Sequence, residues 1–189
     1  MKRILAILAA IVLVFSLVAC GNDEPQIPNG DETPAATTPE ETTPEETAPS
    51  VSDKTMGQQL LDHFNAYVGA NPEATVEEIA NELLTNEVIQ FMSGAMPVEE
   101  GWLQGFRAES MGGFKSGAMF GPMMGSIAFV GYVFELEDGA DADAFMQNLQ
   151  DNADARWQIC VTADETVIEQ NGNLVFFLMC DNGLLNGMG

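Results

Sequence analysis

The sequence predicts an α+β fold, and three observations support this prediction. Apolar residues recur at helical spacing over residues 56–68 and again over residues 76–91, which predicts two amphipathic helices. An almost continuous apolar run, residues 127–136, is typical of a strand that is covered on both faces. Asn171-Gly172 separates two further apolar segments and is the strongest short hairpin signal in the chain. Helices grouped apart from hairpin-connected strands favour an N-terminal helix pair followed by a mostly antiparallel sheet.

Polar residues mark the ends of the two expected helices. We expect the folded part to start near Ser52 and the first helix to end at Gly69, ahead of Asn71-Pro72. Thr75 is followed three residues later by Glu78, which is the pattern of a capping box and predicts the start of the second helix. The short link between the two helices predicts that they pack antiparallel.

Glycines break the apolar pattern between residues 93 and 125. We expect loops and irregular strands there, with one short strand over residues 101–106. After the buried strand, Asp138 or Asp141 is the expected N-cap of a third helix, whose apolar stripe runs from Ala142 to Leu149.

Three apolar segments end the chain, at residues 157–163, 166–170 and 174–180. We interpret them as a C-terminal β-meander. Residues 127–163 then form a strand–helix–strand unit, which should cross over right-handed if its two strands are parallel.

The N-terminus has the pattern of a secretory signal. Basic Lys2-Arg3 precede an apolar run, residues 4–19, and small residues stand directly before Cys20. Leu17-Val18-Ala19-Cys20 resembles the lipobox of bacterial lipoproteins, and the resemblance covers residues 1–21. It implies that signal peptidase II cuts before Cys20 and that the sulfur of this cysteine carries a diacylglyceryl group. The apolar run is shorter than the roughly 20 residues that a membrane-spanning helix needs.

Three regions follow from this interpretation: a signal peptide (1–19), a tether (20–53) and a single α+β domain (54–189). Residues 21–53 hold nine acidic residues, no Lys or Arg, and a repeated Thr-Thr-Pro-Glu-Glu sequence. Such a segment has little apolar surface to bury, so we expect it to be disordered and extended. The domain is similar to lipoproteins of Gram-positive bacteria that have no assigned function.

The chain is strongly acidic, with a formal net charge of −23. Loss of residues 1–19 removes Lys2-Arg3 and leaves four basic residues against 29 acidic ones. Nucleic acid is excluded as a partner, because binding there depends on cations that neutralise phosphates. Anionic lipid headgroups also repel this chain, so the lipid on Cys20 would have to hold it at the membrane, and two acyl chains give a stable anchor.

His63 is the only histidine of the chain. A hydrolase with a Ser or Cys nucleophile would need it as the base, but no serine lies in a G-x-S-x-G pattern. Lys115-Ser116-Gly117 resembles one box of penicillin-binding enzymes, whose S-x-x-K box is missing here. We therefore interpret His63 as a structural residue.

Four acidic residues, Glu137, Asp138, Asp141 and Asp143, cluster where the third helix should start. A calcium loop needs Gly at its sixth position and Glu at its twelfth, and neither Asp138 nor Asp141 begins such a loop. Acidic residues at a helix N-terminus are favoured by the helix dipole. With one His and no close Cys pair, a transition-metal site is not expected either, and we expect no cofactor.

Two further groups lie in the glycine-rich segment. Met111, Met119, Met123 and Met124 could bind Cu(I) through their thioethers or form an adaptable binding surface, but methionine also fills gaps in cores, which is the interpretation we favour.

The second group consists of Trp102, Phe106, Phe114 and the neighbouring Arg107. Aromatic residues beside an arginine are common in binding patches. Core packing is the better interpretation of the rings, but a binding site, if there is one, is expected at these residues.

Cys160 and Cys180 remain once Cys20 is lipidated. In the expected meander they lie too far apart for a disulfide, whose Cα atoms must be within about 7 Å. We therefore predict two free, largely buried thiols.

The function expected from these observations is that of a lipid-anchored protein on the outer face of a bacterial cytoplasmic membrane, Gram-positive in type. Its domain would bind a cell-surface protein or a small ligand without catalysis. Two alternatives stay open: a hydrolase of cell-wall or extracellular material that uses a carboxylate pair, and a structural or assembly module.

Overall fold

The computed structural model describes residues 54–186, and the α+β fold class is confirmed there. The expected signal peptide (1–19) and the expected tether (20–53) lie outside the described residues. The elements, in chain order, are α1 (Met56–Ala70), α2 (Val76–Leu83), β1 (Ser93–Val98), β2 (Ser116–Pro122), β3 (Phe129–Glu135), α3 (Ala142–Asn152), β4 (Glu165–Asn171), β5 (Leu174–Cys180) and the short 3-10 helix η1 (Asn182–Asn186).

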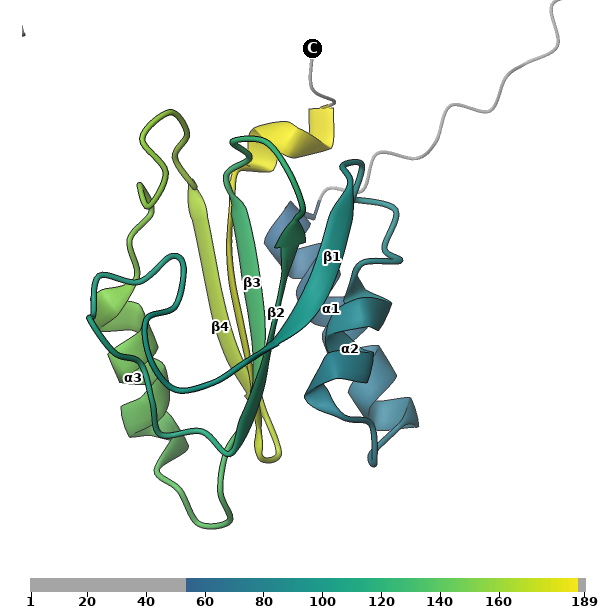
Figure 1. Cartoon of the computed structure of the whole chain (residues 1–189). Helices are drawn as coiled ribbons and strands as arrows, with labels where there is room; N and C mark the ends of the chain where they lie inside the picture. Colours follow the sequence, from purple (N-terminus) through teal and green to yellow (C-terminus); the bar gives the residue numbers. More distant parts are fainter. Residues whose placement is uncertain (1–53, 187–189) are drawn as a thin grey trace, which may run out of the picture. The chain divides into compact units, whose positions relative to one another are not determined.

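The five strands form one sheet in the order β1-β2-β3-β5-β4, and every neighbouring pair is antiparallel. Figure 1 shows this sheet between α3 and the pair α1 and α2. Because β5 is antiparallel to both β3 and β4, these two strands run parallel to each other. A strand–helix–strand unit is therefore present as β3-α3-β4, with β5 inserted between its two strands, but its second strand is β4 and not the expected residues 157–163.

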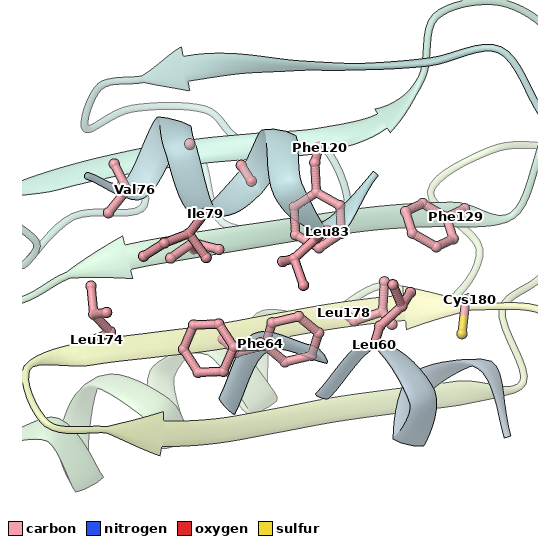
Figure 2. Packing of buried hydrophobic residues seen from close by; sticks show 14 of the residues in the cluster. Leu60, Phe64, Val76, Ile79, Leu83, Phe120, Phe129, Leu174, Leu178 and Cys180 are labelled. Carbon is pink, nitrogen blue, oxygen red and sulfur yellow. The ribbon is translucent and has the colours of Figure 1, made fainter. Parts of the chain in front are cut away.

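Each face of the sheet has its own apolar core. Leu60 and Phe64 of α1 and Ile79 of α2 pack on one face, as Figure 2 shows. The opposite face is covered by Phe145 and Leu149 of α3 and by residues of the long β1–β2 connection. β3 and β5 are buried along almost their whole length, which confirms the prediction of a strand covered on both faces.

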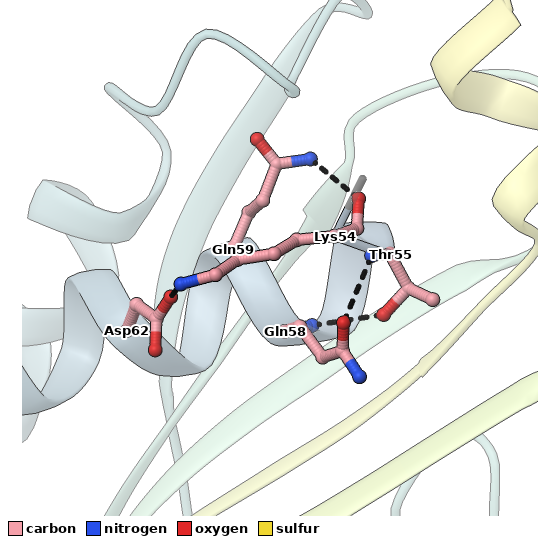
Figure 3. Close-up of polar contacts among 5 residues, drawn as sticks. All are labelled: Lys54, Thr55, Gln58, Gln59 and Asp62. Atoms are coloured by element: carbon pink, nitrogen blue, oxygen red, sulfur yellow. Dashed lines mark hydrogen bonds and ion pairs between the residues drawn. The ribbon is translucent and has the colours of Figure 1, made fainter. Parts of the chain in front are cut away.

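Helix α1 begins with a capping box that the sequence analysis missed. Thr55 is the N-cap: its side chain accepts a hydrogen bond from the Gln58 N–H at 3.2 Å, and the Gln58 side chain accepts one from the Thr55 N–H at 3.2 Å (Figure 3). Lys54, which directly precedes the N-cap, pairs with Asp62 on the helix. The helix thus begins at Met56, the first residue of the predicted apolar stripe, and Gln at the third helical position closes the box as Glu would.

Helix α2 starts as predicted but ends sooner. The Thr75 side chain accepts from the Glu78 N–H at 3.3 Å, and Glu78 accepts from the Thr75 N–H at 2.9 Å. The helix stops at Leu83, so Val88 and Phe91 follow it instead of continuing its stripe. Both still reach the core, and the ring of Phe91 lies 5.1 Å from that of Phe129.

Helix α3 is capped by Asp141, one of the two expected N-caps. The Asp141 side chain accepts a hydrogen bond from the Ala144 N–H at 3.0 Å. This places a carboxylate at the positive end of the helix dipole, as expected for the acidic residues in this segment.

The glycine-rich segment contains two regular strands, β1 and β2, instead of the expected irregular ones. A Cβ at Gly117 would lie 2.9 Å from Val98 Cγ2 and 3.1 Å from Phe134 Cδ1, so here glycine permits close packing within a strand. The strand expected over residues 101–106 was wrong: only isolated bridges occur at its two ends. Gly105 has a φ of 91°, which interrupts extended backbone.

The prediction of a strand over residues 157–163, the first of the expected meander, was also wrong. The Ala163 N–H donates to the Ala155 carbonyl at 2.9 Å, so the segment closes on itself as a loop. Its alternating apolar residues do not share a buried face, because Ile159 is 95% exposed.

The β4–β5 hairpin forms where Asn171-Gly172 predicted it. A two-residue turn at Asn171-Gly172 itself would place Glu169 opposite Leu174, but Asn171 pairs with Leu174 and the turn residues are Gly172, with a φ of 64°, and Asn173, so Glu169 lies opposite Phe176. This shift of the pairing by two residues leaves every side chain on the same face, because side chains alternate with a period of two.

Candidate functional site

The four residues expected to form a binding site are divided by the fold. Trp102 is 71% exposed and Arg107 is exposed too, whereas Phe106 and Phe114 are buried in the core on the α3 side of the sheet. The Phe106 ring lies 4.7 Å from that of Phe177, and the Phe114 ring lies 4.9 Å from that of Phe134. The two phenylalanines therefore hold the β1–β2 connection on the sheet and offer no surface to a partner.

Arg107 is fixed at this surface by contacts to the end of α3. Its backbone N–H donates to the Asn152 carbonyl at 2.8 Å, and its guanidinium lies 3.8 Å from Asp154. Since Asp154 offsets its charge, Arg107 is not an isolated cation in an acidic domain. Of the expected site, Trp102 alone remains as a large exposed apolar side chain.

A second group of exposed apolar residues lies at one edge of the sheet. Of the six large hydrophobic side chains that are exposed in the described part of the chain, four are methionines near the start of β1 and the end of β2. Met92, Met96, Met123 and Met124, called the methionine surface below, are each between 54% and 68% exposed. Four methionines were expected in the core from the sequence, Met111, Met119, Met123 and Met124. Of these four, Met111 is buried and Met119 is half-buried, but Met123 and Met124 are exposed.

The pairing of β1 with β2 brings these methionines together. The Met123 N–H donates to the Met92 carbonyl at 2.9 Å, just beyond the paired residues Ser93 and Pro122. Met96 lies directly opposite Met119, so both side chains leave the same face of the sheet. Met119 packs partly against the core on the α3 side. Met96 and Met119 therefore lie on the same face of the sheet as α3, which covers the strands at the opposite edge.

Glycines form the backbone beneath part of the methionine surface. Gly94 and Gly121 are directly paired, and they share the face of Met96 and Met119 because residues two apart in a strand point the same way. A Cβ at Gly94 would lie 3.1 Å from Cγ and 3.3 Å from Sδ of Met123. The Met123 side chain therefore lies over Gly94, on the face that also carries Met96.

None of the helices between residues 54 and 186 covers this part of the sheet. Helix α3 packs on β4 and β5, and α1 and α2 pack on the opposite face. β1 is an edge strand, as Figure 1 shows, and it contains Pro97, which lacks an N–H and is typical of edge strands. A partner would therefore bind across the face of β1 and β2 more readily than by adding a strand to the edge.

Two carboxylates, Glu135 and Glu78, form hydrogen bonds that stabilise the fold. Glu135 accepts hydrogen bonds from Lys115 Nζ at 2.7 Å and from the Ser116 hydroxyl at 2.8 Å, and both lower its pKa. The backbone N–H and the hydroxyl of Thr75 lower the pKa of Glu78 in the same way. A general acid needs a raised pKa, so neither carboxyl is suited to that role.

His63 joins the two N-terminal helices. Its Nδ1 atom lies 3.2 Å from the Asn86 side-chain amide, and its Nε2 atom lies 3.4 Å from Glu82. These contacts fit the structural role that the sequence predicted for it.

Cys160 and Cys180 are both free, as predicted, but only Cys180 is buried. Cys160 lies in the loop that replaces the expected strand and is exposed. Burial, and secondarily Glu165, raises the pKa of the Cys180 thiol, which keeps it protonated.

Sequence reasoning missed Met92 and Met96, although a signal was present. Six of the eleven methionines of the chain fall between residues 92 and 124, but only the pairing of β1 with β2 brings Met92 to Met123 and Met96 to Met119.

Within residues 54–186, no group of three or more His, Cys, Asp or Glu side chains is arranged to hold a metal ion. No helix in this described range is long and apolar enough to cross a membrane. The chain matches no protein-family model, no curated protein and no solved structure.

Proposed function

We propose that this chain is a lipid-anchored, extracytoplasmic binding protein that takes its ligand on the methionine surface and carries out no catalysis. Cys20 in its lipobox-like context supports the anchor on the outer face of a cytoplasmic membrane. The observation that carries the binding role is the concentration of four exposed methionines on a part of the sheet that α1, α2 and α3 leave uncovered.

Exposing apolar side chains to water is unfavourable. Contiguous exposed apolar patches on soluble domains are characteristic of interaction sites. Methionine is unbranched and polarizable, so a methionine surface adapts to its ligand. The contacts of Glu135, Glu78 and Asp141 are those of helix caps and surface ion pairs, and they favour a binding role over the alternative of a carboxylate-based hydrolase.

The anchor is tested by replacing Cys20. We expect Cys20→Ala to move the protein from the membrane fraction to the medium, or to leave residues 1–19 attached. A wild-type protein that keeps residues 1–19 and gains no lipid mass would contradict the anchor.

The binding surface is tested by methionine oxidation, which needs no knowledge of the ligand. Peroxide converts exposed methionine to the sulfoxide, and a bound ligand shields the sulfur. We expect Met92, Met96, Met123 and Met124 to oxidise several-fold more slowly on intact cells than in the purified chain, with half-buried Met146 of α3 as the internal reference. Equal relative rates in the two samples would mean that the methionine surface is unoccupied, and would overturn the proposal.

A further inference from the structure

The methionine surface has the composition of a soft-metal site as well as that of an apolar patch. Thioethers are uncharged, soft ligands that select Cu(I) over harder cations. A metal site requires that the fold places several of these sulfur atoms around one point, which follows from the geometry in three steps.

The first step is the cross-strand pair Met96 and Met119. Directly opposed residues of an antiparallel pair have Cβ atoms about 5 Å apart, and these two leave the same face. Met96 is 54% exposed and Met119 is half-buried, so the pair lies at the boundary between core and solvent. The backbone thus holds the Cβ atoms of two methionines side by side on one face.

The second step is Met123. Its Cγ and Sδ atoms lie over Gly94, and Gly94 is two residues before Met96, or about 7 Å along the same face of the strand. Because Gly94 and its partner Gly121 have no side chains, nothing from these two positions stands between Met123 and the Met96–Met119 pair. A methionine has three rotatable side-chain bonds, which is enough to bring the sulfurs to a common point across this gap.

The third step is Met92. Its carbonyl accepts the Met123 N–H at 2.9 Å, so the two backbones are adjacent. Phe91 and Ala95 pack toward the core on the α1–α2 side, and alternation then directs Met92 toward the opposite face, where Gly94 and Met96 lie. A fourth thioether is therefore available at the same place.

We propose that Met92, Met96, Met119 and Met123 form a Cu(I)-binding site above the Gly94–Gly121 pair. This inference rests on the proposed function and names its ligand. The residues bind the ion through neutral sulfur atoms, so no proton has to leave when the metal enters. The strands hold Met96, Met119 and the backbone of Met123 in place before binding, which lowers the ordering cost.

The experiment is a titration of the chain from residue 20 onward with Cu(I) alone, under anaerobic conditions and against a competing chromophoric chelator. Cys20→Ser and Cys160→Ser remove the accessible thiols that would otherwise compete, whereas Cys180 is buried with a raised pKa and can stay. We expect one Cu(I) per chain and shifts of the four methionine methyl resonances, with buried Met56 as the unshifted reference.

Leucine substitutions separate sulfur ligation from apolar docking. Met→Leu at positions 92, 96, 119 and 123 keeps the apolar surface and removes the thioethers, so Cu(I) affinity should fall at least about tenfold. Met146→Leu on α3 is the matched control and should bind like the parent chain. Circular dichroism of both variants checks that the fold is retained, and the single variant Met123→Leu, at an exposed position, repeats the test with the smallest structural change.

The pH dependence gives an independent readout. Ligands such as thiolate, imidazole and carboxylate lose metal as they take up protons, but a thioether has no proton to gain in this range. Cu(I) affinity should therefore be the same at pH 5.5 and pH 7.5, and Zn(II), whose ligands are Cys, His and carboxylate, should not bind at these methionines. Absence of Cu(I) binding, or binding that the leucine variant retains, would overturn the site. If the methionines are still protected from oxidation on cells in that case, the proposed binding function stands and its ligand is an apolar one.

Discussion

The hydroxyl of Thr55 donates a hydrogen bond of 2.6 Å to Oε1 of Glu165, although the two residues are 110 positions apart in the chain. The other carboxylate oxygen accepts the Gly57 N–H at 3.0 Å and the Cys180 thiol at 3.6 Å. The first turn of α1 is thereby joined to the first residue of β4. Gly57 permits this approach, because a Cβ there would lie 2.7 Å from Cδ of Glu165.

Replacing Glu165 should therefore destabilise the domain. Glu165→Ala removes a charged acceptor and leaves the Thr55 hydroxyl and the Gly57 N–H without it, and we expect a loss of about 2 kcal/mol in the free energy of unfolding. Urea denaturation at pH 7 measures it. Glu169→Ala, an exposed position on the same strand, is the control and should stay within about 0.5 kcal/mol of wild type. Equal effects of the two substitutions would contradict the role of Glu165.

Two glycine-to-alanine substitutions should have opposite signs. A Cβ at Gly131 in β3 would lie 2.2 Å from Cζ of the fully buried Phe120, so Gly131→Ala should cost about 1–3 kcal/mol by overpacking. At Gly69 in α1 nothing lies within 4 Å of the added atom, and Gly69→Ala should stabilise the helix by about 0.5–1 kcal/mol. Thermal unfolding compares the two, and a tolerated Gly131→Ala would mean that Phe120 can move.

Glu135 should contribute to the acid sensitivity of the fold. Hydrogen bonds from Lys115 and Ser116 lower its pKa below the ordinary 4.5, so the unfolded chain takes up the proton first as the pH falls. The stability that Glu135 provides is present above pH 4.5 and is lost as the pH drops through its lowered, folded-state pKa. Glu135→Gln should therefore show a smaller decrease in unfolding midpoint between pH 7 and pH 3.

Lys115→Met tests the cause of that shift. It should raise the pKa of Glu135 toward 4.5, as measured by NMR titration of the carboxyl carbon. A wild-type pH dependence in both Glu135→Gln and Lys115→Met would rule out this pair as a source of acid sensitivity.

The two thiols of the domain should differ in reactivity. Cys160 is exposed, whereas Cys180 is buried and has a raised pKa, and the thiolate is the reactive form. In the Cys20→Ser chain at pH 8, Ellman's reagent should label one thiol in the folded protein and two after unfolding in urea. Cys160→Ser should abolish the fast reaction, and two fast thiols in the folded protein would contradict the burial of Cys180.

The features that the sequence predicted correctly are those that depend on nearby residues. The Thr75–Glu78 capping box and the cap at Asp141 involve atoms three residues apart, and the Asn171-Gly172 hairpin joins adjacent strands. These interactions are local, so the order of the residue types is enough to determine them. The continuous apolar run of β3 likewise required cover on both faces.

Tertiary structure alone decided which strands are neighbours and which side chains stay exposed. β5 lies between β3 and β4, and the apolar residues 157–163 form a loop instead of a strand on the free edge of β4. Trp102 and Phe106 are similar in hydrophobicity, yet only Phe106 meets a core. In the same way, Met119 is half-buried whereas Met123 is exposed. The exposure of a side chain depends on which distant parts of the chain pack on the sheet beside it. No local pattern of residues contains that information.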